Sequence, residues 1–121
     1  MHRSLFITGC ISGFLSVAVG AFAAHLLKSR ITPDLLEIFE VGVRYQFYHA
    51  FAILIAAIVW QWLGGASETA GWLFVGGTVV FSGSLYLMSL TGMRWLGAIT
   101  PVGGVMFLAG WAMLAIAAWR R

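Results

Sequence analysis

The chain has 121 residues, of which 61% are hydrophobic and only 9% are charged, and its mean hydropathy is +0.95. A soluble domain carries roughly 25% charged residues, so this composition excludes a water-soluble globule of this size. The net charge of +3 comes from seven Lys and Arg residues scattered in ones and twos, which excludes a basic surface for nucleic acid.

The first apolar stretch covers about residues 4–27 and is long enough to cross a bilayer, which needs about 20 apolar residues in a helix. Small residues recur along it at spacings of three and four, at Gly9, Gly13, Ser16, Gly20 and Ala24. Because helices in lipid associate through close packing of small residues, we interpret this stripe as a packing face. We favour a neighbouring helix of the same chain over a second copy as its partner.

The longest stretch between apolar segments is residues 28–44. Thr32 and Pro33 are typical of a helix start, and an apolar residue recurs at every fourth position from 35 to 43. We predict a short amphipathic helix at about residues 33–45 that lies in the membrane interface and runs into the next span.

Three further apolar stretches complete four predicted spans, at about residues 46–63, 70–90 and 96–119. An even number of spans places both termini and the 64–69 turn at one end of the bundle, which we call the terminal end. Residues 28–44 and the 91–95 turn then lie at the other end, the loop end. Lys and Arg are divided three against four between the two ends, so the positive-inside rule gives no orientation.

Hydrophilic side chains are concentrated at the loop end, whereas the terminal half of the predicted bundle is almost purely apolar. Glu40 and Arg44 are spaced to pair along one helix face, and His25 and His49 lie at the ends of successive spans. Because an ionisable group at membrane depth is costly, such a concentration predicts a site. The candidate ligand-binding residues are His25, Glu40, Arg44, Tyr45, His49, Ser84 and Tyr86.

The same residues admit other interpretations. Histidines and tyrosines at helix ends also act as interfacial anchors, and serines in apolar helices often bond the carbonyl four residues earlier. A small proton-linked or anion transporter or channel would use the titration of His49, although carriers normally place polar groups near the bilayer midplane. His25 and His49 are also a candidate axial pair for one haem iron. We expect no catalytic residue, no metal site and no resident cofactor, and the single cysteine, Cys10, excludes a multi-cysteine metal site.

Four strings of residues carry a resemblance to a known family: VGAFAAHLLK (19–28), FEVGVRYQFYHAFAIL (39–54), LFVGGTVVFSGSLYLMSLTG (73–92) and LGAITPVGGVMFLAGW (96–111). Together they resemble the small bacterial inner-membrane proteins of the YgdD/YwdK type, a family of unknown function with a four-span eukaryotic relative. The resemblance covers essentially the whole chain and implies location and topology, but no activity. This chain's versions of the family strings include Gly20, His25, Tyr45, Gln46, His49, Ser84, Tyr86, Thr100, Pro101, Gly103 and Gly104.

The sequence therefore predicts an all-α fold: a four-helix transmembrane bundle with a short interfacial amphipathic helix between spans one and two, in a single domain over residues 1–121. The expected function is that of a non-enzymatic, multi-pass protein of the bacterial inner membrane, with a polar site at one membrane face. A lipid headgroup, a small ligand or a partner subunit would occupy this site. The expected partners are the lipid bilayer, a bound lipid and further copies of the chain, and nucleic acid is not among them.

Overall fold

A computed structural model describes all residues, 1–121, and contains helices and no strand. The four long helices are α1 (Arg3–His25), α2 (Pro33–Leu63), α3 (Gly65–Thr91) and α4 (Thr100–Trp119). Two short 3-10 helices, η1 (Leu27–Ser29) and η2 (Arg94–Ala98), precede α2 and α4. Four segments are long and apolar enough to cross a membrane. The predicted all-α, four-span fold is therefore confirmed.

Helix α2 is a single continuous helix of 31 residues. It begins at Pro33, whose fixed φ suits the first helical position, after Thr32 in an extended conformation. The residues predicted for the amphipathic helix form its first turns, with no break before the second span. At 1.5 Å per residue α2 is roughly 46 Å long, whereas the hydrocarbon core is about 30 Å thick. The start of α2 therefore extends beyond the hydrocarbon core.

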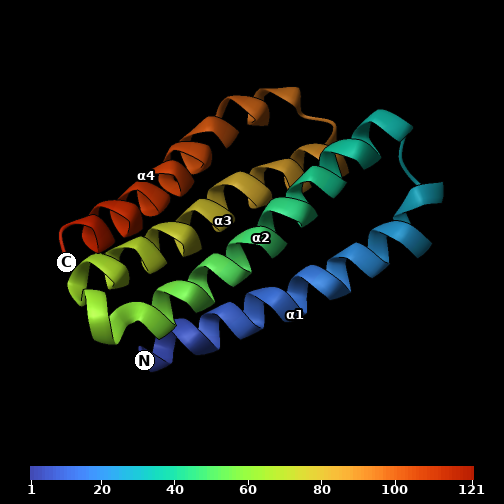
Figure 1. The fold of residues 1–121 in the computed structure, drawn as a ribbon. Helices are drawn as coiled ribbons and strands as arrows, with labels where there is room; N and C mark the ends of the chain where they lie inside the picture. Colours follow the sequence, from blue (N-terminus) through green and yellow to red (C-terminus); the bar gives the residue numbers. More distant parts are fainter.

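The four helices lie side by side in chain order (Figure 1). Helix α2 packs between α1 and α3, and α3 packs between α2 and α4. Helices α1 and α4 do not touch each other, so the bundle is open, with α1 and α4 at its two edges. Both chain termini and the α2–α3 turn lie at the terminal end, and the two remaining connections lie at the loop end (Figure 1).

One apolar cluster joins all four helices. Its buried members are Leu5, Ala52, Ile53, Ala57, Ala70, Phe74 and Phe107. Close approach of α4 to α3 depends on Gly103, because a Cβ at this position would lie 2.4 Å from the backbone nitrogen of Phe81. Since backbone atoms cannot move aside as a flexible side chain can, only glycine fits this contact.

Candidate functional site

Helices α1 and α2 pack through small residues in an antiparallel register. Gly9 lies opposite Leu54, and a Cβ at Gly9 would lie 2.8 Å from that side chain. Gly13 lies opposite Ala50, with 3.9 Å between the two Cβ positions. The small-residue stripe of α1 is therefore a packing face within the chain at both glycines, as the sequence predicted.

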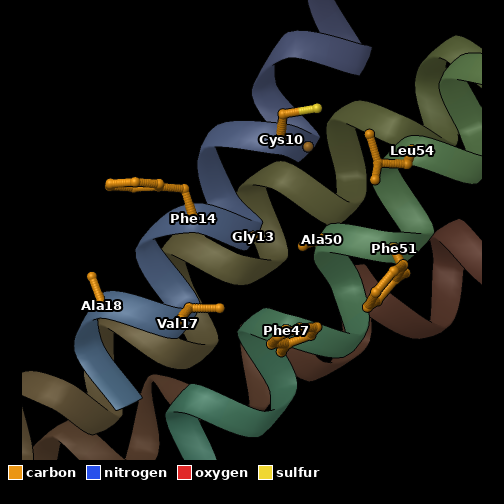
Figure 2. Close-up of a pocket in the computed structure, with 10 residues that line it drawn as sticks. Cys10, Gly13, Phe14, Val17, Ala18, Phe47, Ala50, Phe51 and Leu54 are labelled. Atoms are coloured by element: carbon orange, nitrogen blue, oxygen red, sulfur yellow. The ribbon is translucent and has the colours of Figure 1, made fainter. Parts of the chain in front are cut away.

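Beside this contact, the outer surface of α1 and α2 carries a groove of about 540 Å³ (Figure 2). Gly13 and Ala50 lie at its floor, where the two helices meet. Cys10 and Val17 of α1 line one side, and Phe51 of α2 lines the other. No lining side chain is charged. In a chain that spans a membrane, such an open apolar groove faces the lipid acyl chains.

Towards the loop end, the face of α2 that lines the groove continues to two charged residues outside the groove. Phe51, Phe47, Arg44 and Glu40 follow one another at spacings of four, three and four, so they lie along one face of the helix. Arg44 is exposed and Glu40 is half-buried, and the predicted pair between them is not formed. Tryptophan favours the membrane interface, so Trp60 marks one border of the core, and Arg44 lies roughly 24 Å farther along α2, close to the other border.

His25 is the exposed last residue of α1, and its side chain forms no hydrogen bond or ion pair. Because Gly13 packs against Ala50, His49 lies level with Phe14 of α1, about 17 Å along the helix axis from His25. Two axial ligands of one iron must both lie within bonding distance of the metal. The interpretation of these histidines as a haem-binding pair is therefore wrong.

His49 lies halfway along α2 and not at the end of a helix. Its Nε2 accepts a hydrogen bond from Nε1 of Trp111 in α4 at 3.1 Å, since an indole can only donate. The neutral ring then carries its proton on Nδ1, which donates to the carbonyl of Tyr45 at 2.8 Å. The ring also stacks on Phe107, with 3.5 Å between the centroids. Both ring nitrogens are thus occupied, which weighs against a role in proton exchange.

Tyr86 and Ser84 hold neighbouring helices together. The Tyr86 hydroxyl donates to Oε1 of Gln46 at 2.6 Å, and Nε2 of Gln46 donates to the carbonyl of Ser12 at 3.2 Å. These two bonds connect α3, α2 and α1. The Ser84 hydroxyl is hydrogen-bonded to that of Thr100 at 2.6 Å, which connects α3 to α4. Polar bonds of this kind stabilise helix association in lipid, where a free polar group has no water to bind.

The seven candidate residues therefore do not meet in one site. Tyr45 and His49 lie together, with their rings stacked. Ser84 and Tyr86 form hydrogen bonds to neighbouring helices. The side chains of His25, Glu40 and Arg44 lie at the loop end without partners. Sequence reasoning missed the groove, although the apolar face that continues beyond Arg44 at Phe47 and Phe51 was a signal. It also missed Trp111 as the partner of His49, for which no local pattern exists.

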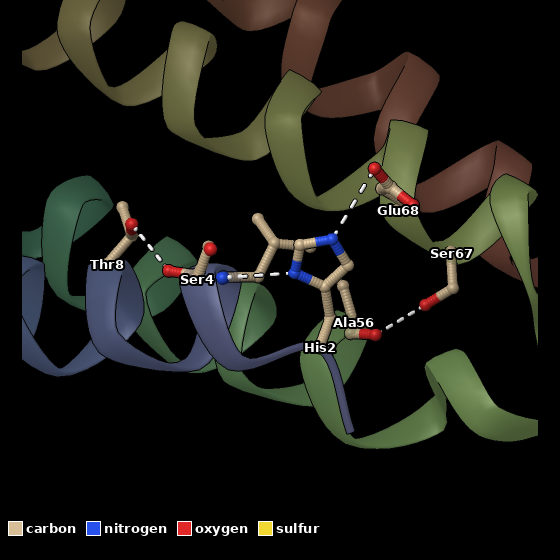
Figure 3. A network of polar contacts seen from close by, with 7 residues as sticks. His2, Ser4, Thr8, Ala56, Ser67 and Glu68 are labelled. Atoms are coloured by element: carbon tan, nitrogen blue, oxygen red, sulfur yellow. Dashed lines mark hydrogen bonds and ion pairs between the residues drawn. The ribbon is translucent and has the colours of Figure 1, made fainter.

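A further polar group lies at the terminal end, in the half that the sequence predicted to be almost purely apolar (Figure 3). Nδ1 of His2 accepts a hydrogen bond from the backbone nitrogen of Leu5 at 3.3 Å and so caps α1. Nε2 of His2 lies 3.4 Å from Oε1 of Glu68 in α3. The backbone nitrogen of His2 also donates to the carbonyl of Ala57 at 2.8 Å. These contacts attach the start of α1 to the ends of α2 and α3.

An exposed ion pair connects α2 to η2 at the loop end. Arg94 donates to Oδ2 of Asp34, and the Thr32 hydroxyl donates to Oδ1 of the same carboxylate. Asp34 lies in the exposed first turn of α2, outside the hydrocarbon core. The hydrogen bond from Thr32, followed by that from Arg94, lowers the pKa of Asp34 from its usual 3.8 to about 2.

Comparison with known proteins gives the family. Residues 19–104 match the family described as "Protein of unknown function (DUF423)". The chain belongs to this family. Relatives of this DUF423 chain include UPF0382 membrane protein YwdK of Bacillus subtilis (strain 168), 45% identical over 93% of both chains. UPF0382 membrane protein SH2409 of Staphylococcus haemolyticus (strain JCSC1435) is 41% identical over 94% of this chain and 93% of the relative. No solved structure matches the chain.

These relatives confirm the family that the four sequence strings indicated. The DUF423 chain is a multi-pass membrane protein with four spans, and a bacterial inner-membrane location is consistent with relatives that are bacterial membrane proteins. The family description assigns no activity.

Proposed function

We propose that this DUF423 protein is a non-enzymatic membrane protein that binds a phospholipid along the α1–α2 groove. The observation that carries the proposal is that the α2 face lining the groove at Phe51 and Phe47 continues, by helical spacing, to Arg44 and Glu40, which have no partner within the chain. An acyl chain matches the uncharged lining. The headgroup of the same molecule would reach Arg44 and Glu40 at the membrane border, close to the phosphates of the bilayer.

Apolar burial alone does not hold a lipid in such a groove. Lipid tails are as apolar as the groove lining, so moving an acyl chain from the bilayer into the groove gains little hydrophobic free energy. Retention then depends on packing against the small-residue floor at Gly13 and Ala50 and on polar contacts at the headgroup. Arg44 supplies such a contact, because guanidinium matches the geometry of phosphate oxygens.

The transporter alternative has less support. A proton-linked carrier needs a titratable group that exchanges protons near the midplane. His49 lies at that depth, but Trp111 and the carbonyl of Tyr45 occupy both of its nitrogens. These two hydrogen bonds fix the orientation of the ring. A pH-dependent flux in proteoliposomes that His49→Ala abolishes would restore this alternative.

Native mass spectrometry of the purified protein tests lipid binding directly. Val17 lines the groove and is 61% exposed, whereas Val102 lies outside it on α4 and is 57% exposed. We expect wild-type protein and Val102→Trp to retain phospholipid after detergent extraction. Val17→Trp fills the groove and should lose it. Equal retention by both variants would contradict binding in this groove.

A further inference from the structure

We infer that the bound lipid carries a primary ammonium group beyond its phosphate, as phosphatidylethanolamine does, with the phosphate at Arg44 and the ammonium at Glu40. This inference rests on the proposed function and adds the headgroup class. It depends on three observations: the order of apolar and charged side chains along α2, the absence of other partners for Arg44 and Glu40, and the short side chains of α1 beside them.

The order of side chains along α2 matches the order of groups in such a lipid. Phe51 and Phe47 line the groove, Arg44 follows them, and Glu40 lies one turn farther towards the loop end. The rise of four residues separates Arg44 and Glu40 by about 6 Å along the axis. A phospholipid presents its acyl chain, its phosphate and its ammonium in the same sequence from the bilayer core outward.

Glu40 and Arg44 are both available for a ligand. Neither forms an ion pair or a side-chain hydrogen bond, although their spacing would allow them to pair. Of the two other acidic residues at the start of α2, Asp34 is already held by Arg94, and Glu37 is exposed to solvent rather than half-buried. A half-buried carboxylate without a partner is unfavourable, and an ammonium at Glu40 would relieve this.

Helix α1 carries short side chains beside these charges. Ala21 and Ala24 follow the groove residues Phe14 and Val17 by seven positions, which is two helical turns, so they continue the same face. Both alanines are exposed. Because their side chains are short, they add little bulk between α1 and Glu40.

The carboxylate of Glu40 distinguishes between headgroups. A primary ammonium donates hydrogen bonds to a carboxylate, and these charge-assisted bonds are among the strongest in proteins. A trimethylammonium group has no hydrogen to donate. An anionic headgroup with no ammonium would leave Glu40 without a cation and add net negative charge beside it, which is repulsive. The geometry therefore favours phosphatidylethanolamine over phosphatidylcholine and phosphatidylglycerol.

The experiment places the full chain in detergent with equal amounts of these three phospholipids and measures retained lipid by native mass spectrometry. We expect wild-type protein to retain phosphatidylethanolamine about fivefold over phosphatidylglycerol, the ratio that ~1 kcal/mol of ion pairing gives. Glu40→Gln should remove this preference. Glu68→Gln makes the same change to a half-buried glutamate at the terminal end and should leave it intact. Arg44→Gln should lower retention of all three lipids.

The outcomes separate the headgroup assignment from the proposed function. If wild-type protein retains all three lipids equally while Val17→Trp still releases them, the headgroup assignment is overturned and lipid binding in the groove stands. If Val17→Trp releases nothing, both are overturned. Should Glu40→Gln fail to fold, the wild-type comparison of phosphatidylethanolamine with phosphatidylcholine decides, because these lipids differ only in the methylation of the ammonium.

Discussion

Replacing Gly103 with alanine tests the closest helix contact in the bundle. The added Cβ would lie 2.4 Å from the backbone nitrogen of Phe81 and 2.7 Å from its Cβ. Ordinary packing needs about 3.5–4.0 Å between such atoms, so α4 must move away from α3 by roughly 1 Å. Overpacking of this kind destabilises by about 1–3 kcal/mol. Because α4 packs mainly on α3, this movement weakens most of its attachment to the bundle.

Unfolding by sodium dodecyl sulfate in mixed micelles, followed by far-ultraviolet circular dichroism, measures this loss. Gly83→Ala is the matched control, because a Cβ at Gly83 meets nothing within 4 Å. Both glycines lie in transmembrane helices, so both substitutions replace glycine with a better helix former. We expect the control to stay within about 0.5 kcal/mol of the wild type. Equal stability of the two variants would refute the close α3–α4 packing.

Three further outcomes follow from single contacts. Trp111→Phe removes the donor to His49 and should destabilise by about 0.6 kcal/mol, and by no more than ~1.7, with a shift of the His49 Nε2 resonance in nitrogen-15 NMR; an unchanged resonance would contradict the bond. The lowered pKa of Asp34 means that its contacts stabilise the fold above pH 3.8 and that this contribution is lost as pH falls towards about 2. Thermal unfolding across that range should show a smaller acid-induced change in Arg94→Gln, and an identical change would disprove the contribution. Cys10 should resist a charged maleimide until the protein is unfolded in sodium dodecyl sulfate, because its groove faces acyl chains, where a thiol does not ionise to the reactive thiolate; rapid labelling of the folded protein would place Cys10 in water.

The spans and the packing stripe of α1 could be predicted because both are local patterns. Twenty apolar residues in succession identify a membrane helix whatever surrounds them. Gly9 and Gly13 show a close-packing face through their spacing alone, and the structure places Leu54 and Ala50 against them.

The depth of His49 could not be predicted from hydropathy. Hydropathy falls before Gln46, so the second span was expected to begin there, with His49 at its edge. The backbone hydrogen bonds of α2 continue to Pro33 regardless of side-chain polarity, and His49 therefore lies at the middle of the helix. Its partner Trp111 is 62 positions away, a separation that no periodicity encodes.

The polar residues of the loop end separate for a similar reason. Sequence spacing gives the level of each residue along the bundle but not the side of the helix that faces a neighbour. Tyr86 and Arg44 belong to the same end, yet Tyr86 turns inward to Gln46 whereas Arg44 is exposed. Only the arrangement of α1 beside α2 shows that Phe47 and Phe51, on the same face of α2 as Arg44, line a groove.

Photochemical crosslinking tests lipid binding in the α1–α2 groove most directly. Phosphatidylethanolamine with a photoreactive group in its acyl chain is incorporated into liposomes with the wild-type protein, and the adducts are mapped by peptide mass spectrometry. We expect them to concentrate on residues 9–18 of α1 and 47–54 of α2. Adducts spread over the exposed faces of all four helices, including Val105 and Leu108 of α4, would contradict a lipid site in the groove.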